Sequence, residues 1–293
     1  MEDFDKWEKA SLIAAEALQY GKTLIKPGAS FLDVTEKVEL KIAELGGQCA
    51  FPAQMSLNEV AAHFTVDPGE DIIFEDQLVS LDIGVHIDGC IGDTALTVDL
   101  SGKYTDLVQA SRDALDNAIK VVQVGTPLSE IGKVIHDTIT GFGYSPIKNL
   151  SGHGLSPYNI HDRPSVPNFD TGDTTKLKRG MVIAIEPFAT TGAGMIYESG
   201  IGNIFSQVGH KPVRSSLTRP VLQHIETYKN LPFTTRWLVK RFSIGQVRFA
   251  LRELSNLGVI RDYPPLPDRN KGMVSQAEHT LYIDDKVKVL TRL

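Results

Sequence analysis

The sequence predicts a mixed α/β (α+β) protein that is built from two similar halves and carries a smaller, basic inserted subdomain. Three observations lead to this prediction. Residues 78–100 have the pattern of a β-hairpin, helical and strand patterns of the first hundred residues recur about a hundred residues later, and residues 206–262 differ in charge from their surroundings. We therefore expect two helix–helix–strand halves that share one sheet, with the helices packed on it.

The first half begins with two amphipathic helices. Apolar and small residues recur three and four positions apart over residues 4–18, which predicts a first helix. Ser30, followed three residues later by Asp33, has the spacing of a capping box and predicts the start of a second helix. The apolar stripe of that helix runs over residues 31–45, and Gly46-Gly47 predicts its end.

The hairpin carries two carboxylates. Asp88-Gly89 between two alternating runs is a strong signal for a two-residue turn. With that turn, Gly84 faces Asp93 across the strands, and Asp82 lies on the same face, diagonal to Asp93. Such diagonal neighbours are roughly 7–8 Å apart, within reach of a shared ligand.

Two acids in apolar strands are costly to bury without a partner, and that partner is often a metal ion. No Lys or Arg lies between residues 78 and 100 to provide a counter-charge. The alternative is a pair of acids on a solvent-facing side of the sheet. The hairpin taken alone leaves both interpretations open.

The second half repeats the order of elements. Residues 103–124 and 128–141 have helical periodicity, and residues 181–186 form an apolar run that ends in an acid, as residues 78–82 do. Between them, residues 149–161 are rich in Gly and Ser and predict a loop or an irregular edge. This stretch carries two histidines eight positions apart, His153 and His161, so only tertiary structure can bring them to one site.

The predicted insertion is basic. Residues 206–262 hold ten Lys or Arg and three acids, a net charge of +7, which leaves −13 for the rest of the chain. Residues 243–258 predict a helix that ends at Gly258 and resembles the helical part of a winged-helix module; its expected inward residues are Ile244, Val247, Leu251 and Leu254. After the insertion, residues 272–293 return to strand character.

Bulk properties narrow the functional classes. The chain has 293 residues and a formal charge of −6, which disfavours a dedicated binder of nucleic acid. Its two cysteines, Cys49 and Cys90, form no CxxC pair and no disulfide framework. No secretory signal and no apolar run long enough for a membrane span is visible, so we expect a cytoplasmic protein. Without a long heptad seam we expect a monomer.

Five unusual residues stand out because each lies in an apolar strand or at a Gly-rich edge. They are four carboxylates and one imidazole: Asp82, Asp93, His153, Glu186 and Glu278. Such a set can hold two divalent cations and favours Mn, Fe, Co or Zn over thiolate-bound metals. Without metal, clustered acids would repel one another and raise their pKa values.

These motifs are similar to those of a known family. LDIGVHIDGCIGDTALTV, SGHGLSPYNIH, AIEPF and AEHT resemble the motifs of type 2 methionine aminopeptidases, in particular the archaeal form, over nearly the whole chain. The resemblance implies the pita-bread fold, in which two pseudo-symmetric halves surround a dinuclear metal site. It implies a catalytic domain of residues 1–205 and 263–293 and an insertion of residues 206–262. It also implies removal of the initiator methionine from nascent chains with a small second residue.

The resemblance assigns metal-binding roles to single residues. It implies that Asp82 chelates one cation and that Asp93 and Glu278 bridge both cations. His153 and Glu186 would then hold the second cation. We expect a metal-activated hydroxide to attack the substrate carbonyl, with Glu186 passing the water proton to the leaving amine.

The resemblance also implies a substrate site. His63 and His161 match histidines that contact the substrate, and we expect them to donate to groups that develop charge in the transition state. The residues that match the lining of the methionine pocket are Phe51, Ile160, Tyr263 and Leu266. Plain packing beside Pro264-Pro265 is the alternative role for Tyr263.

Other functions remain open at this level. A proline dipeptidase of the same fold is one alternative, although such members usually have a further N-terminal domain. A non-catalytic relative that binds RNA or protein through the basic insertion is another, although relatives of that kind have lost metal ligands. A winged-helix regulator is a third. Expected partners are N-terminal peptides of nascent proteins, with the ribosome as a candidate and neither a membrane nor specific DNA.

Overall fold

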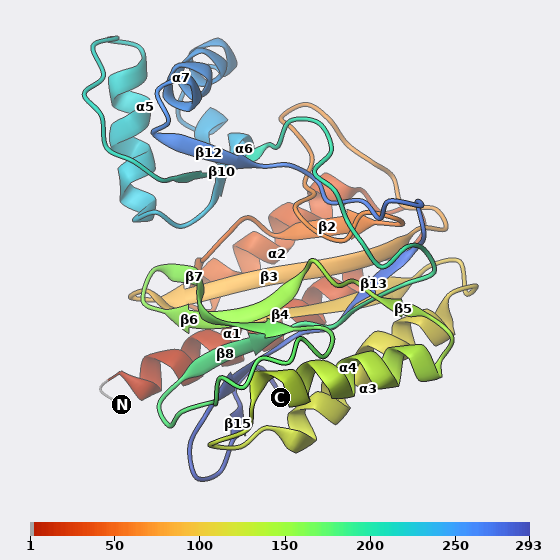
Figure 1. Ribbon diagram of the computed structural model, residues 1–293. Helices are drawn as coiled ribbons and strands as arrows, with labels where there is room; N and C mark the ends of the chain where they lie inside the picture. Colours follow the sequence, from red (N-terminus) through yellow and green to blue (C-terminus); the bar gives the residue numbers. More distant parts are fainter. Residues whose placement is uncertain (1–2) are drawn as a thin grey trace.

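Paired helices lie on the outside of the strands in the computed structural model, which describes residues 3–293 (Figure 1). In the first half, α1 (Phe4–Leu24) and α2 (Phe31–Glu44) pack on a sheet formed by β1 (Gln48–Cys49), β2 (Gln54–Leu57), β3 (Leu78–Ile87) and β4 (Cys90–Asp99). The predicted cap is present, since the Ser30 hydroxyl accepts a hydrogen bond from the Asp33 N–H at 3.0 Å.

In the second half, α3 (Thr105–Val121) and α4 (Leu128–Gly141) pack on a five-stranded sheet of order β15-β14-β8-β6-β7. Its strands are β6 (Ser151–Ser156), β7 (Asn159–Pro167), β8 (Val182–Ile185), β14 (His279–Tyr282) and β15 (Lys288–Val289). A smaller sheet beside it consists of β5 (Ser145–Pro146), β9 (Phe188–Thr190) and β13 (Val274–Gln276).

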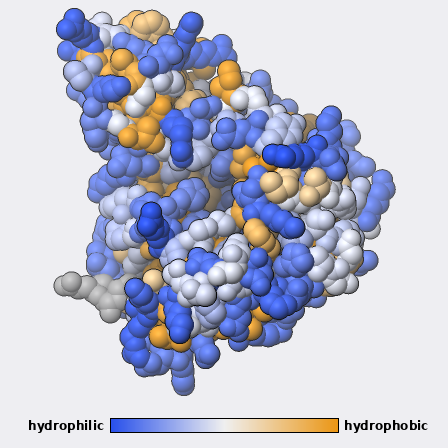
Figure 2. All heavy atoms as spheres, viewed as in Figure 1, coloured by the Kyte–Doolittle hydropathy of each residue, from blue (hydrophilic) through white to orange (hydrophobic). Residues whose placement is uncertain are grey.

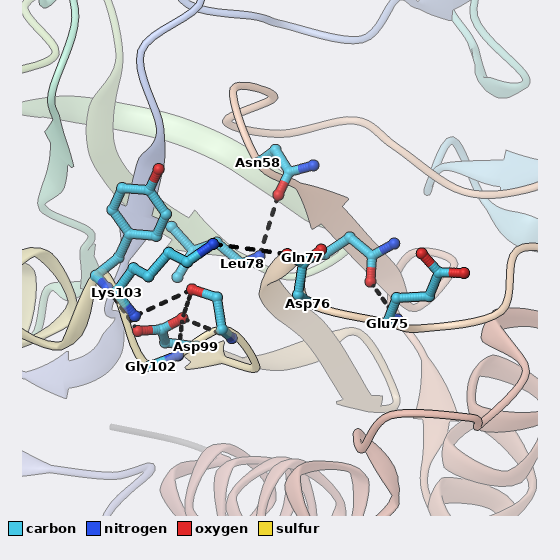
Figure 3. A network of polar contacts seen from close by, with 10 residues as sticks. Asn58, Glu75, Asp76, Gln77, Leu78, Asp99, Gly102 and Lys103 are labelled. Carbon is cyan, nitrogen blue, oxygen red and sulfur yellow. Dashed lines mark hydrogen bonds and ion pairs between the residues drawn. The ribbon is translucent and has the colours of Figure 1, made fainter.

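The predicted hairpin is confirmed. Ile87 pairs with Cys90 and Gly84 pairs with Asp93. Both turn residues have positive φ, 50° at Asp88 and 92° at Gly89, as a tight two-residue turn requires. At the opposite end, a polar network anchors the base of the hairpin to its flanking loops, for example through the Leu78 N–H, which donates to Asn58 Oδ1 at 3.1 Å (Figure 3).

Equivalent backbone hydrogen bonds confirm the relation between the two halves. In each half they tie the start of the second helix to a later extended segment. The bonds are Gly28 N to Phe74 O (2.7 Å) and Phe31 N to Ile72 O (2.8 Å), then Gly125 N to Leu177 O (2.8 Å) and Leu128 N to Thr175 O (2.9 Å). The donors of the two pairs are 97 residues apart, close to the offset that the sequence pattern indicated.

One sequence prediction needs correction. The halves do not share one sheet, because the backbone pairing between β4 and the β13–β14 segment is the isolated bridge between Ala95 and Glu278. Of the two alternatives for the Gly-rich stretch, a loop or an irregular edge, the structure has the second: it forms the β6–β7 hairpin at the edge of the sheet, with register shifts on both sides of Gly154. Glycine is needed there because a Cβ on Gly154 would lie 2.1 Å from the Arg163 carbonyl oxygen. The glycine in this stretch therefore allows the neighbouring strands to lie close together.

Within the chain between β9 and β13, residues 204–263 form a separate lobe (Figure 1). Its elements are β10 (Ile204–Gln207), α5 (Thr218–Ile225), the 3₁₀ turn η1 (Glu226–Tyr228), β11 (Phe233–Thr234), α6 (Thr235–Val239), α7 (Ile244–Asn256) and β12 (Ile260–Tyr263). They have their own sheet, of order β11-β10-β12, and their own apolar cluster. Of the four residues expected to face inward on α7, Ile244 is 40% exposed, because it begins the helix before the packed stripe starts.

A hollow in the molecular surface lies between this lobe and the main body (Figure 2). A buried ion pair crosses the boundary, since Arg236 of α6 donates to Glu39 of α2. None of the helices in residues 3–293 is long and apolar enough to cross a membrane.

Candidate active site

All eleven residues that the sequence singled out line one cavity of about 490 Å³. The cavity lies where the two halves meet the insertion lobe, so its wall also contains Ile204 of β10 and Arg261 of β12. Its volume is in the range that holds a small ligand or a peptide end. Residues scattered from Phe51 to Glu278 thus come together in one site.

The five acid and histidine side chains come from strands of both halves. Asp82 and Asp93 lie on β3 and β4, and His153 lies on β6. Glu186 directly follows β8, and Glu278 directly precedes β14. Because β4 runs beside the β13–β14 segment, the acids of the first half face those of the second half across the junction.

Three of these side chains are close enough to share a cation, and Glu186 lies beside His153. One ligand atom from each of Asp93, His153 and Glu278 lies within 4.8 Å of the others. His153 Nε2 is 3.4 Å from Glu186 Oε1 and 3.9 Å from Asp93 Oδ2. The cluster therefore combines oxygen and imidazole donors in one buried place, with Asp93 and Glu278 each 2% exposed.

Burial and mutual repulsion raise the pKa values of the acids. Burial raises the pKa of Asp82 to about 7. Burial, followed by the neighbouring acids, raises the pKa of Asp93, Glu186 and Glu278 well above the usual range. Four ionised carboxylates are thus unfavourable here unless positive charge accompanies them.

Two observations show that the cluster fits divalent cations. The buried oxygens Asp82 Oδ1 and Asp93 Oδ1 have no hydrogen-bond partner within residues 3–293, so both can serve as ligands. His153 Nδ1 lies 3.3 Å from the Gly154 carbonyl oxygen, which can only accept. The proton is therefore on Nδ1, and the Nε2 lone pair points toward the acids. Burial lowers the pKa of His153 to about 3, so the ring is neutral, as a metal ligand must be.

The two further histidines stand at the same cavity. His63 Nδ1 is 3.3 Å from the Pro264 carbonyl oxygen, so this nitrogen donates and the other ring nitrogen is free to accept. Burial lowers the pKa of His63 to about 4. Burial, and next the charge of Arg261, lowers the pKa of His161 as well. Both rings are neutral near pH 7, and His63 in this tautomer donates through its free nitrogen only after protonation.

The apolar part of the cavity is formed by buried side chains, one of which packs directly on a backbone glycine. Phe51, Ile160 and Leu266 are each 5–6% exposed. Phe51 lies directly against Gly84, where a Cβ would be 2.2 Å from the phenyl ring. Gly84 is the residue paired with Asp93, so one position of β3 serves both the acid cluster and the apolar wall.

Some residues at the site were not found from the sequence. The side-chain amide of Gln276 lies beside the acids and lowers the pKa of Asp82 and Glu186, against the larger effect of burial. Gln276 precedes Glu278 by two residues, and in a strand this spacing places both side chains on one face, so the sequence did carry a signal for it. Gln54 Oε1 accepts from the His63 N–H at 2.7 Å and holds His63 at a φ of 65°. No local signal distinguished Arg261 from the other basic residues of the insertion.

Comparisons with known proteins agree with this site. Residues 5–214 match the model of metallopeptidase family M24, and the chain belongs to this family. Relatives that are similar in sequence over nearly the whole chain are methionine aminopeptidases. The chain is 44% identical to that of Thermococcus onnurineus, with 99% of this chain and 100% of the relative covered, and 45% identical to that of Archaeoglobus fulgidus, with 98% and 97% covered.

Solved structures confirm the fold. The crystal structure of methionine aminopeptidase from Thermotoga maritima superimposes with a TM-score of 0.73 at 22% identity, over 100% of this chain and 97% of that chain. The pita-bread fold and the family membership that the motifs indicated are therefore confirmed.

Proposed function

We propose that this metallopeptidase removes the initiator methionine from nascent proteins whose second residue is small. The observation that carries this function is a cavity that joins an acidic metal site to a small apolar pocket, in a chain similar to methionine aminopeptidases over its full length. The chain is thus an enzyme of the methionine aminopeptidase type, and a free peptide N-terminus is its substrate.

The metal site is proposed to hold two divalent cations. Asp82 would bind one of them, His153 and Glu186 would bind the other, and Asp93 and Glu278 would bridge both. Bound there, the cations would lower the pKa of a water molecule and polarise the scissile carbonyl. The ligand set suits Mn, Fe, Co or Zn.

Protein groups around the cluster then complete the chemistry. Glu186, which lies at the cavity 3.4 Å from His153 Nε2, is proposed to accept the proton of the attacking water and to transfer it to the leaving amine. The free ring nitrogen of His63 would accept a hydrogen bond from the N–H of the scissile amide and so orient the amide. His161, at the same cavity, would contact the substrate next to it.

The apolar residues are proposed to hold the methionine side chain. Phe51, Ile160 and Leu266 offer a buried surface for an unbranched thioether. Tyr263 closes this side, with its ring 5.3 Å from the His63 ring and its hydroxyl 3.0 Å from Ser206 Oγ. Since Tyr263 ends β12, the last strand of the lobe, the lobe would help to form the substrate pocket.

The test is methionine release from Met-Ala-Ser by the metal-free protein, before and after addition of Mn(II). We expect release only with metal, no release by Asp93→Ala, and normal release by Asp76→Ala, an exposed acid in the loop before β3. Glu186→Gln should keep its fold and lose turnover. An Xaa-Pro dipeptide serves as the second substrate: cleavage of that peptide in place of Met-Ala-Ser would favour a proline dipeptidase.

Partners and organisation complete the proposal. Residues 206–262 are proposed as a distinct subdomain, which the separate apolar cluster supports. Its helix α7 exposes Arg248 and Arg252, neither of which forms an ion pair with residues 3–293. We propose ribosomal RNA as a partner of this face, in a monomeric, cytoplasmic enzyme. Salt-sensitive cosedimentation with ribosomes tests this, and no cosedimentation at low salt would contradict it.

A further inference from the structure

The two halves of the molecule meet along a seam that is not an ordinary β-ladder. Strand β4 and the β13–β14 segment run antiparallel, with the Glu278 N–H donating to the Ala95 carbonyl at 3.0 Å. In this register Asp93 lies opposite Thr280, two positions to one side of the bridge. Thr97 lies opposite Gln276, two positions to the other side.

Threonine hydroxyls replace the backbone pairs at both flanking positions. Thr280 Oγ1 accepts from the Asp93 N–H at 2.8 Å and donates to the Asp93 carbonyl at 2.8 Å. Thr97 Oγ1 accepts from the Gln276 N–H and donates to the Gln276 carbonyl, again at 2.8 Å each. One hydroxyl therefore satisfies both backbone groups of the facing residue, and the arrangement is two-fold symmetric about the Ala95–Glu278 bridge.

The seam carries two residues of the acid cluster. Asp93 is held by Thr280, and Glu278 sits at the bridge, where its carbonyl also accepts from Thr94 Oγ1 at 2.9 Å. Because a hydroxyl stands between the two backbones, they must lie farther apart than in direct N–H···O=C pairing. The hydroxyl thereby determines the separation of the strands that carry Asp93 and Glu278. Thr280 is fully buried, so water has no access to take its place.

We propose that Thr280 and Thr97 are positioning residues of the metal site, which hold its carboxylates in place across the two halves through hydroxyl bridges. The proposal rests on the proposed function in one respect, namely that these acids bind divalent cations. It predicts that a hydroxyl, and not merely a side chain of this volume, is required at position 280. Removal of groups that orient metal ligands commonly weakens metal binding by about 10- to 100-fold.

The experiment compares Thr280→Val, which keeps the shape and removes the hydroxyl, with Thr280→Ser, which keeps the hydroxyl. Mn(II) affinity is measured by calorimetry on the metal-free full chain, and the visible spectrum of the Co(II)-loaded protein reports ligand geometry. The matched control is Thr35→Val in α2, another fully buried threonine whose hydroxyl donates to a backbone carbonyl, at 2.9 Å from Phe31 O. If Thr280→Val does not fold, Thr97→Val is measured in its place against Thr97→Ser.

We expect Thr280→Val to bind Mn(II) about 10- to 100-fold more weakly, Thr280→Ser to bind it nearly as wild type, and Thr35→Val to be unchanged. Wild-type affinity in the valine variant would overturn the proposal, as would equal loss in the serine variant. Failure of the wild-type chain to bind Mn(II) would instead contradict the proposed function, so the two failures are distinguishable.

Discussion

Glu39→Gln tests how the lobe of residues 204–263 is held on the main body. Glu39 Oε1 accepts from Arg236 Nη2 at 2.7 Å, and Glu39 Oε2 accepts from Arg236 Nη1 at 3.3 Å and from Trp237 Nε1 at 3.0 Å. The Arg236 side chain is 3% exposed and the Glu39 side chain 10%. Removing the carboxylate charge leaves a buried guanidinium without its counter-ion, which typically costs about 3–5 kcal/mol.

The assay is thermal unfolding combined with amide hydrogen exchange. At about 2–4 °C per kcal/mol, the expected fall in Tm is roughly 6–20 °C. Hydrogen exchange should accelerate first in α6 and β11, while amides of α3 and α4 keep their protection. Because β12 of the same lobe carries Tyr263, KM for Met-Ala-Ser should rise more than kcat falls.

A neighbouring ion pair provides the control. Glu36 of the same helix is 3.8 Å from Lys240, and the two side chains are 50% and 60% exposed. Glu36→Gln should therefore change stability by less than about 1 kcal/mol. The double variant Glu39→Leu with Arg236→Met should recover much of the loss, since it leaves no buried charge unpaired. A Glu39→Gln protein with the Tm of Glu36→Gln would refute the reasoning.

Three further predictions follow from single contacts. Asp268→Asn should lower the free energy of unfolding in urea by about 2–4 kcal/mol, because this buried carboxylate accepts from four backbone N–H groups, and an unchanged midpoint would contradict this. Gly92→Ala should cost about 1–3 kcal/mol, because its Cβ would lie 2.4 Å from Ser11 Cα; wild-type stability would show that α1 moves freely on the sheet. Finally, the rise in Tm on adding Mn(II) should grow from pH 5 to pH 8. Burial raises the pKa of Asp82 in the folded state to about 7 from its ordinary value of 3.8, so the metal-free fold loses stability as pH rises from about 4 to about 7, while Mn(II) gains ionised ligands; a constant rise would contradict this.

Local sequence determined the turns and helix ends, because their signals lie within a few residues of one another. The Asp88-Gly89 turn set the register of β3 and β4, and this register alone placed Asp82 and Asp93 on one face. The Ser30 cap likewise set the start of α2. The four acids stood out because charged groups are rare in apolar strands, and His153 because it lies at a Gly-rich edge. Motif similarity extended the set to the other residues that line the cavity.

Only the tertiary structure decided how these pieces meet. From composition alone, the Gly-rich stretch around His153 could be a loop or an irregular edge. It forms a strand because its close contact with β7 and β8 requires glycine. The junction of the halves depends on Thr280 facing Asp93, residues 187 positions apart along the chain. No periodicity encodes this contact, because it forms only when the two sheets pack together and bring Thr280 opposite Asp93.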